Sequence, residues 1–225
     1  MRRTFFFLLT SGLGLVILLS LGVWQLQRLA WKEGILAEIE AKIAAAPTPL
    51  PHTPDPEADK YRPVEISGHF EPGEIHVITS IKGPGPGYRI IAAFQTDDGR
   101  RIMVERGFVP TRNKRMDRPL GAAKLIGNLH WPVEVDSFTP TPDTGTNVWY
   151  ARDVVPMAET LQTDPILVIQ RTDPASGLRL TPVGIDGIAN DHLQYALTWF
   201  SLAFIWAAMT AYFLWRTRAT SKGST

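Results

Sequence analysis

One apolar stretch decides the fold: residues 5–23 read FFFLLTSGLGLVILLSLGV and contain no charged side chain. At about 1.5 Å per residue, a helix of this length nearly crosses the hydrocarbon layer of a bilayer. The run is longer than the apolar core of a cleaved signal peptide, and no small-residue cleavage site follows it. Trp24, Arg28 and Trp31 come next, as in an interfacial anchor. The sequence therefore predicts a retained membrane helix over residues 5–24.

A second apolar run, at residues 193–215, also contains no charged side chain. Basic residues without acidic ones flank both runs, namely Arg2 and Arg3 before the first and Arg216, Arg218 and Lys222 after the second. Short tails rich in Lys and Arg stay in the cytoplasm, whereas a long loop between two spans is translocated whatever its charge. The sequence therefore predicts a membrane protein with spans at 5–24 and 192–215, cytoplasmic tails at 1–4 and 216–225, and residues 25–191 outside the membrane.

Small residues recur along both predicted spans. Ala203, Ala207 and Ala211 are spaced by four on the second span, and Thr10 and Gly14 are spaced likewise on the first. This spacing puts small side chains on one face of a helix, where they let membrane helices approach closely. We therefore expect the two spans to pair.

The composition limits the chemistry of the chain. The formal net charge is only +1, whereas phosphate binding requires a clustered basic excess, so no nucleic-acid partner is expected. The absence of cysteine excludes disulfides, thiolate metal sites and thiol nucleophiles. The sequence contains neither a Gly-x-Ser-x-Gly nor a His-Glu-x-x-His motif, so no hydrolytic enzyme is predicted.

The segment between the spans changes character twice. A helical pattern continues through residues 25–46, and the prolines of residues 47–59 then indicate an extended linker. Residues 60–182 carry short β-branched and aromatic runs, which predict an α+β domain of mainly antiparallel strands, with partial closure into a barrel as one form of the sheet. The predicted strands are 63–70, 75–80, 88–96, 101–109, 124–131, 148–151 and 166–171, and a helix capped by Asp153 is predicted over 154–161.

Two histidines fall beside a predicted turn. Glu71-Pro72-Gly73-Glu74 is typical of a turn, which predicts a hairpin that places His69 opposite His76. Directly opposed strand residues lie close enough for both imidazoles to bind one metal ion. Two ligands without a third make a poor site, however, and a pair of exposed surface histidines is the alternative.

A basic stretch lies between residues 100 and 118. Its charge suits lipid phosphates, haem propionates or an acidic partner surface, and a solvated loop is the simpler interpretation. The stretch consists of Arg100, Arg101, Arg106, Arg112, Lys114, Arg115 and Arg118.

His192 follows two good helix-capping residues and so falls in the first turn of the second span. Tyr195, Trp199 and Trp206 come after it at spacings that keep them on the same helix face. A neutral imidazole is the form that ligates haem iron, and an aromatic stripe suits the flanks of a flat apolar ring. From the residues alone, an interfacial histidine above an ordinary aromatic belt is the alternative.

Several motifs are spread over nearly the whole chain: Gly22-Val23-Trp24-Gln25 with Arg28, Gly68-x-Phe70, Gly85-Pro86-Gly87-Tyr88, Val104-Glu105-Arg106-Gly107-Phe108-Val109-Pro110 and Asn190-Asp191-His192-Leu193-Gln194-Tyr195-Ala196-Leu197-Thr198-Trp199-Phe200. Together they resemble the surfeit locus protein 1 family, assembly factors for cytochrome c oxidase, and the last motif is the most specific. Two departures are Phe108, where the family more often has Trp, and Glu105, where Asn is common.

The resemblance implies a non-enzymatic role in building an aa-type haem–copper oxidase, by aiding the delivery of haem a to the catalytic subunit or its insertion there. The histidine described as the haem a ligand in some bacterial members corresponds to His192. Tyr195, Trp199, Trp24 and Arg28 are then expected to complete the site, with Arg28 pairing with a propionate. The implied partners are cytochrome c oxidase subunit I and the lipid bilayer, with haem a synthase as a further one to consider.

Other interpretations stay open beside this one. A scaffold that binds oxidase subunits without haem is the main alternative, while an enzyme lacks a visible catalytic constellation. Copper delivery is weaker still, because copper chaperones generally use cysteine thiolates. The basic start without a long Arg- and Ser-rich leader predicts a bacterial inner membrane, with both termini in the cytoplasm and the central domain in the periplasm.

Overall fold

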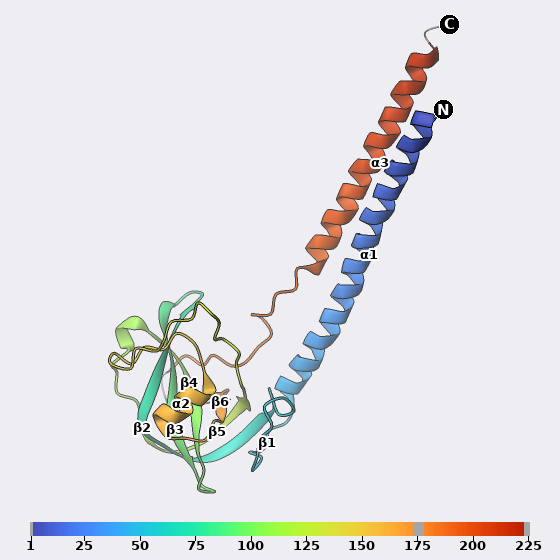
Figure 1. Cartoon of the computed structure of the whole chain (residues 1–225). Helices are drawn as coiled ribbons and strands as arrows, with labels where there is room; N and C mark the ends of the chain where they lie inside the picture. Colours follow the sequence, from blue (N-terminus) through green and yellow to red (C-terminus); the bar gives the residue numbers. More distant parts are fainter. Residues whose placement is uncertain (1, 173–177, 223–225) are drawn as a thin grey trace. The chain divides into compact units, whose positions relative to one another are not determined.

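The structure is a computed structural model that describes residues 2–172 and 178–222. The chain forms two compact units: one joins Met1–Glu38 to Asp186–Thr225, and the other comprises Ile39–Ile185. The first unit holds the long helices and the second holds the sheet (Figure 1). Met1 and residues 223–225 of the predicted tails, and residues 173–177 of the predicted β-rich segment, lie outside the described residues.

Two long helices, α1 (Arg2–Ala44) and α3 (His192–Lys222), contain the apolar runs. Over Phe5–Ala44 and His192–Thr217 they are long and apolar enough to cross a membrane, judged by length and composition. The prediction of one apolar helix before and one after a sheet domain in the sequence is therefore confirmed. The helical pattern expected beyond residue 24 is part of the same uninterrupted α1, because the first proline of the chain is Pro47.

Within the first unit, α1 and α3 lie side by side and antiparallel (Figure 1). Near the start of α1, the rings of Phe7 and Phe213 lie 4.7 Å apart between centroids. Further along, the indole nitrogen of Trp206 donates a hydrogen bond of 2.9 Å to the backbone oxygen of Ser11. The expected pairing of the two helices is thus present, and both aromatic packing and a polar contact hold it.

The packing face of α3 repeats every seven residues and not every fourth. Ala196 and Ala203 are 1% and 2% exposed, whereas Ala207 is half-buried and Ala211 is exposed. Helices that pair at a small crossing angle meet at intervals of about 3.5 residues, so a four-residue repeat drifts off the contact face. Of the three alanines predicted to form the contact, therefore, mainly Ala203 lies in it.

On α1 the closest approach is made by glycines. A Cβ atom at Gly22 would come within 2.7 Å of the Phe200 ring, and one at Gly14 within 3.2 Å of the Trp206 ring. Thr10, which the spacing placed beside Gly14, is instead exposed and donates its hydroxyl to a carbonyl of its own helix. Gly14 alone of that predicted pair lies in the interface.

In the described part of the second unit, the chain forms six strands and two short helices. They are β1 (Thr48–Pro49), β2 (Pro63–Ile81), β3 (Gly85–Thr96), β4 (Arg101–Pro110), η1 (Thr111–Asn113), β5 (Gly121–Leu129), α2 (Val154–Leu161) and β6 (Leu167–Gln170). Helix α2 has the predicted bounds, and Asp153 is its first flanking residue, but the Asp153 side chain makes no capping hydrogen bond. The predicted strand at 148–151 is wrong: Trp149 makes only an isolated bridge to Val77, and no regular ladder follows.

The sheet is mixed. Four pairings are antiparallel, namely β2–β3, β3–β4, β2–β5 and β5–β6, and two are parallel, namely β1–β2 and β4–β6. The strand order is β1-β2-β3-β4-β6-β5. The last strand of this order, β5, also pairs with the second, β2. The mainly antiparallel character matches the prediction. The parallel β4–β6 pairing is possible because the chain between these two strands is long and contains β5 and α2.

The predicted hairpin at residues 71–74 is wrong. Strand β2 continues through them, and its register against β3 shifts between Phe70 and Glu74. Gly73 has a φ of +106°, a conformation that glycine adopts without strain, so the segment forms a bulge that bends one long strand. The reversal comes later, at Gly83 and Pro84, because Ile81 pairs with Gly85 at the start of β3.

Two apolar clusters form the core of the sheet unit. One lies among the strands and includes Val64, Phe94 and Leu125. The other packs α2 against the sheet through Met157 and Leu161. The partly buried Trp131 touches both clusters, and its indole nitrogen donates to the backbone oxygen of Pro165 at 3.0 Å.

Candidate functional site

The most informative contact of the helix unit joins His192, the first residue of α3, to Gln25 of α1. The Nδ1 atom of His192 lies 2.8 Å from Oε1 of Gln25, and Gln25 is buried. An amide oxygen only accepts hydrogen bonds, so in this contact the imidazole donates from Nδ1. The contact therefore fixes both the direction of the ring and its tautomer.

The other ring nitrogen of His192 is available for chemistry. In the neutral ring with its proton on Nδ1, Nε2 carries a lone pair, and Nε2 makes no hydrogen bond within residues 2–172 and 178–222. The residue is half-buried, so part of its surface is accessible. An imidazole held through one nitrogen with the other free is the usual arrangement of a metal ligand.

Trp24 and Arg28 flank Gln25 along α1. Both are exposed, and the guanidinium of Arg28 stacks 3.9 Å above the ring of Trp31. Arg28 is three residues after Gln25, about one turn away, so it is on the same side of α1 as the His192 contact. The residue that meets His192 is thus Gln25, with Arg28 one turn further along the helix.

On α3, Tyr195 is exposed and Trp199 is half-buried. They follow His192 by three and seven residues, which keeps them near its face of the helix. Trp206 belongs to the same stripe, but its indole nitrogen is already used by the Ser11 carbonyl. Of the three aromatic residues, Tyr195 and Trp199 therefore lie near His192, and Trp206 is fixed against α1.

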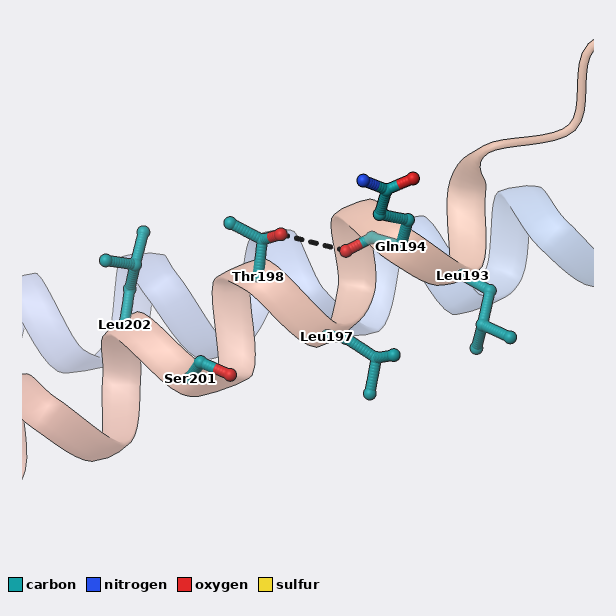
Figure 2. Close-up of a pocket in the computed structure, with 6 residues that line it drawn as sticks. All are labelled: Leu193, Gln194, Leu197, Thr198, Ser201 and Leu202. Atoms are coloured by element: carbon teal, nitrogen blue, oxygen red, sulfur yellow. Dashed lines mark hydrogen bonds between the residues drawn. The ribbon is translucent and has the colours of Figure 1, made fainter.

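A shallow hollow of about 480 Å³ follows another side of α3 (Figure 2). Its lining residues all come from α3: Leu193, Gln194, Leu197, Thr198, Ser201 and Leu202. The hydroxyl of Thr198 donates to the backbone oxygen of Gln194 at 2.9 Å, so it is used within the helix. These positions are turned away from Ala196 and Ala203, because each residue rotates the helix by about 100°. The hollow is thus separate from the Gln25–His192 contact.

In the sheet unit, the two histidines of the metal hypothesis lie on one strand. His69 is opposite Gln95 and Ala122, and His76 is opposite Ile90 with its Nε2 atom 2.6 Å from Oε1 of Glu74. In the part of the chain that the structure describes, no group of three or more His, Cys, Asp or Glu side chains could hold a metal ion. The structure does not provide the opposed pair that the hypothesis required.

Most of the basic stretch between residues 100 and 118 is engaged within the sheet unit. Arg101 donates to Glu71 at 2.5 Å, Arg118 contacts Glu74, and the guanidinium of Arg106 lies 4.0 Å above the Phe70 ring. Arg106 is also almost completely buried. These arginines therefore help to hold the bend of β2 in place.

Glu105 is the centre of a buried polar network. Its carboxylate accepts from Arg89 at 2.5 Å, from Arg152 at 2.9 Å and from the hydroxyl of Thr181 at 2.9 Å. Burial lowers the pKa of Arg152. The carboxylates of Glu105 and Glu134 outweigh this effect and raise the pKa above its ordinary value. The acid at this position, where Asn is common in the family, thus pairs with two arginines inside the domain.

His130 lies in the same neighbourhood and stacks on Tyr61, with 5.4 Å between ring centroids. Burial, followed by the positive charges of Arg152 and Lys60, lowers the pKa of His130 to about 4. Its Nδ1 atom is buried without a hydrogen-bond partner in the described residues. The ring is therefore neutral at physiological pH and has a structural role.

Comparison with known proteins identifies the family. The SURF1 family matches residues 13–204, which include Gln25 and His192. The chain belongs to the SURF1 family. Surfeit locus protein 1 of Rattus norvegicus is 31% identical over 224 residues, covering 87% of this chain and 70% of that protein. The SURF1-like protein of Rickettsia bellii is 30% identical over 230 residues, covering 96% of this chain and 92% of that protein.

In this SURF1 protein, Gln25 is the site residue that sequence reasoning did not select, although it stands in one of the quoted motifs. A signal was present. Gln25 continues the three- and four-residue spacing of Ser11, Gly14, Leu18 and Gly22, so a polar side chain falls on the face that packs against the second helix. A polar residue on such a face needs a partner there, and His192 provides it.

Proposed function

We propose that this SURF1 protein is an assembly factor for an aa-type cytochrome c oxidase and that it holds haem a through His192 for delivery to the catalytic subunit I. Membership of a family known in general for oxidase assembly supports the process. The observation that carries the haem assignment is the Gln25–His192 hydrogen bond, which leaves Nε2 of His192 free. A single histidine is a sufficient protein ligand here, because the porphyrin supplies its own nitrogens to the iron.

The other residues near His192 have separate parts in this proposal. Gln25 keeps the imidazole in the tautomer that presents Nε2. Trp24 and Tyr195 are exposed beside it and offer apolar faces to a flat ring. Arg28 exchanges its contact with Trp31 for a propionate carboxylate. When bound, the haem would supply a redox-active iron centre, which His192 would hold for transfer to the oxidase subunit.

The proposal includes a membrane setting. The two apolar helices are compatible with two spans, and the charge of the tails predicts that both ends are cytoplasmic. The sheet unit then lies in the periplasm of a bacterium, on the inner membrane, where the unit offers surface to subunit I. Haem a synthase is the partner that would supply the haem.

The test is to co-express the full chain with the haem a pathway and to record the Soret absorption of the purified protein. We expect the wild-type protein to bind haem a and His192→Ala to lose it. His52→Ala is the matched control, because His52 is exposed in the proline-rich segment. Full retention of haem a by His192→Ala contradicts the ligand assignment.

A scaffold without a cofactor is the second candidate, and exposed apolar side chains in the sheet unit favour it. Val133 and Phe138 are 91% and 89% exposed. Hydrogen bonds around Asp136, including one of 2.9 Å from the Phe138 amide, shape the turn that presents Phe138. Such rings are typical of protein contacts. A colourless wild-type protein that loses subunit I on Phe138→Ser would favour the scaffold.

A further inference from the structure

An apolar groove of about 370 Å³ lies between α1 and α3 and adjoins the hollow on α3 at Leu202. Its walls are almost entirely hydrocarbon and come from both helices, among them Gly14, Ile17 and Leu18 of α1 and Leu202, Trp206 and Met209 of α3. This volume falls in the range of about 300–1,000 Å³ that is usual for small-molecule sites. The groove therefore has the size and lining of a site for a hydrocarbon chain.

Fixed side chains form the groove. A Cβ atom at Gly14 would come within 3.2 Å of the Trp206 ring, so the absence of a side chain there admits the indole. The hydrogen bond of 2.9 Å from Trp206 to the Ser11 carbonyl then holds the indole against α1. The ring cannot turn into the groove without losing this bond, so the groove is formed before any ligand arrives.

The groove is on the same flank of the helix pair as the residues around His192. Seven residues make nearly two helical turns, so positions seven apart lie almost above one another. On α3 such steps lead from Tyr195 to Leu202 and on to Met209. On α1 one such step leads from Trp24 to Ile17. These steps form a path of apolar side chains that leads from Trp24 and Tyr195 toward the groove.

The length of this path describes the ligand. Leu202 is ten residues and Met209 seventeen residues from His192, which corresponds to about 15 and 25 Å along α3 at 1.5 Å per residue. A flat ring bound at His192 does not reach the groove. A ligand with a long flexible hydrocarbon arm on the ring does.

We propose that this groove holds the isoprenoid tail of haem a, and that it gives the protein its preference for tailed haems over haem b. The inference rests on the proposed function, because it places the ring at His192. Lipid is as apolar as the groove, so burial alone does not favour the groove over the bilayer. The preference comes from close packing of the tail against Ile17, Leu202 and Trp206.

The experiment measures the dissociation constants of haem b and haem o for the full chain in one detergent. Haem o has the tail and haem b lacks it, while the two rings are otherwise alike. Ile17→Trp fills the groove, and Leu19→Trp is the matched control, because Leu19 is exposed on another side of α1 and does not line the groove. We expect the preference for haem o to be about tenfold higher in the wild type and in Leu19→Trp than in Ile17→Trp.

The outcomes separate this inference from the proposed function. Unchanged haem b affinity in both tryptophan variants reports an intact site at His192. If the preference for haem o is then the same in Ile17→Trp as in Leu19→Trp, the tail site is overturned and the proposed function stands. If neither haem binds in a way that depends on His192, the proposed function fails and this inference fails with it.

Discussion

At the scale of single residues, one buried amide sets the state of the proposed ligand. Gln25 accepts from Nδ1 of His192, and no other hydrogen bond holds this imidazole within the described residues. Without the amide, both tautomers become populated and the ring can turn. The role of Gln25 is therefore to position His192, much as outer residues orient metal-bound histidines in other proteins.

Replacing Gln25 by Leu keeps the side-chain volume and removes the acceptor. We expect haem affinity to fall roughly 10- to 100-fold, the usual effect of losing such a positioning contact. Haem titration followed by absorption measures the affinity, and a broadened low-spin signal in electron paramagnetic resonance reports the loosened ring. Gln27→Leu is the control, because Gln27 is exposed on the same helix. Equal affinities in the two variants would contradict a positioning role.

His130 predicts how the sheet unit responds to acid. Its folded pKa is lowered to about 4 by burial and by Arg152 and Lys60, whereas an unfolded histidine titrates near 6.5. The unfolded state therefore takes up this proton first, so stability is fully present above pH 6.5 and falls between pH 6.5 and about 4. The loss from this group amounts to roughly 3 kcal/mol at most.

Urea unfolding of the full chain at pH 7 and pH 4.5 checks this prediction. His130→Gln cannot titrate, so we expect its midpoint to fall less on acidification than that of the wild type. His52→Gln, at an exposed position, should respond as the wild type does. An equal acid response in His130→Gln and the wild type would show that His130 does not carry the effect.

At the scale of elements, the pairing of α1 with α3 depends on a residue without a side chain. A Cβ atom at Gly22 would come within 2.7 Å of the Phe200 ring, whereas one at Gly12 would meet no atom within 4 Å. Gly22 is three residues before Gln25, less than one turn away. A larger side chain there separates the helices at the place where the Gln25–His192 bond forms.

Gly22→Leu should therefore move the helices apart, and Gly12→Leu should leave them in place. The absence of cysteine allows spin labels at engineered Leu26→Cys and Leu193→Cys, two exposed positions, without removing native thiols. Double electron–electron resonance should show a longer distance between the labels in Gly22→Leu only. A distance that stays the same would mean that the Phe200 ring turns aside and that the interface tolerates the change.

The course of strand β2 also depends on contacts with other parts of the chain. The motif at residues 71–74 has the composition of a turn, yet the chain continues as one bent strand. Strand β3 pairs with β2 on both sides of the bulge, at Gly68–Phe70 and at Glu74–Ile81, and β5 pairs with Pro63–Phe70 on the other edge. Turn composition describes a local preference, and pairing with two neighbouring strands outweighs it.

At the scale of the whole molecule, the apolar helices and the tail charges predict a topology. Both ends should be cytoplasmic, and the sheet unit should be periplasmic. In intact cells, a membrane-impermeant maleimide should label Phe138→Cys, because this residue is 89% exposed. Thr4→Cys should be labelled only after the membrane is opened. Labelling of Thr4→Cys in intact cells would reverse the assigned orientation.

The sequence by itself determined the features that depend on near neighbours. Two uncharged runs gave the long helices, β-branched runs gave most strands, and capping residues placed His192 at the start of α3. Each of these follows from hydrophobic period, propensity or capping within a few residues. The Val154–Leu161 helix was predicted with the bounds that the structure shows for the same reason.

Only the tertiary structure decided which side chains meet. An α-helix turns by about 100° per residue. If the packing face is predicted wrongly by one position, a different side chain is placed in the contact. The sequence therefore led to Trp24 and Arg28 as the residues of the first helix at the site, while the structure places Gln25 in direct contact with His192. The return of β5 to β2 likewise depends on pairing between distant segments, which no local pattern encodes.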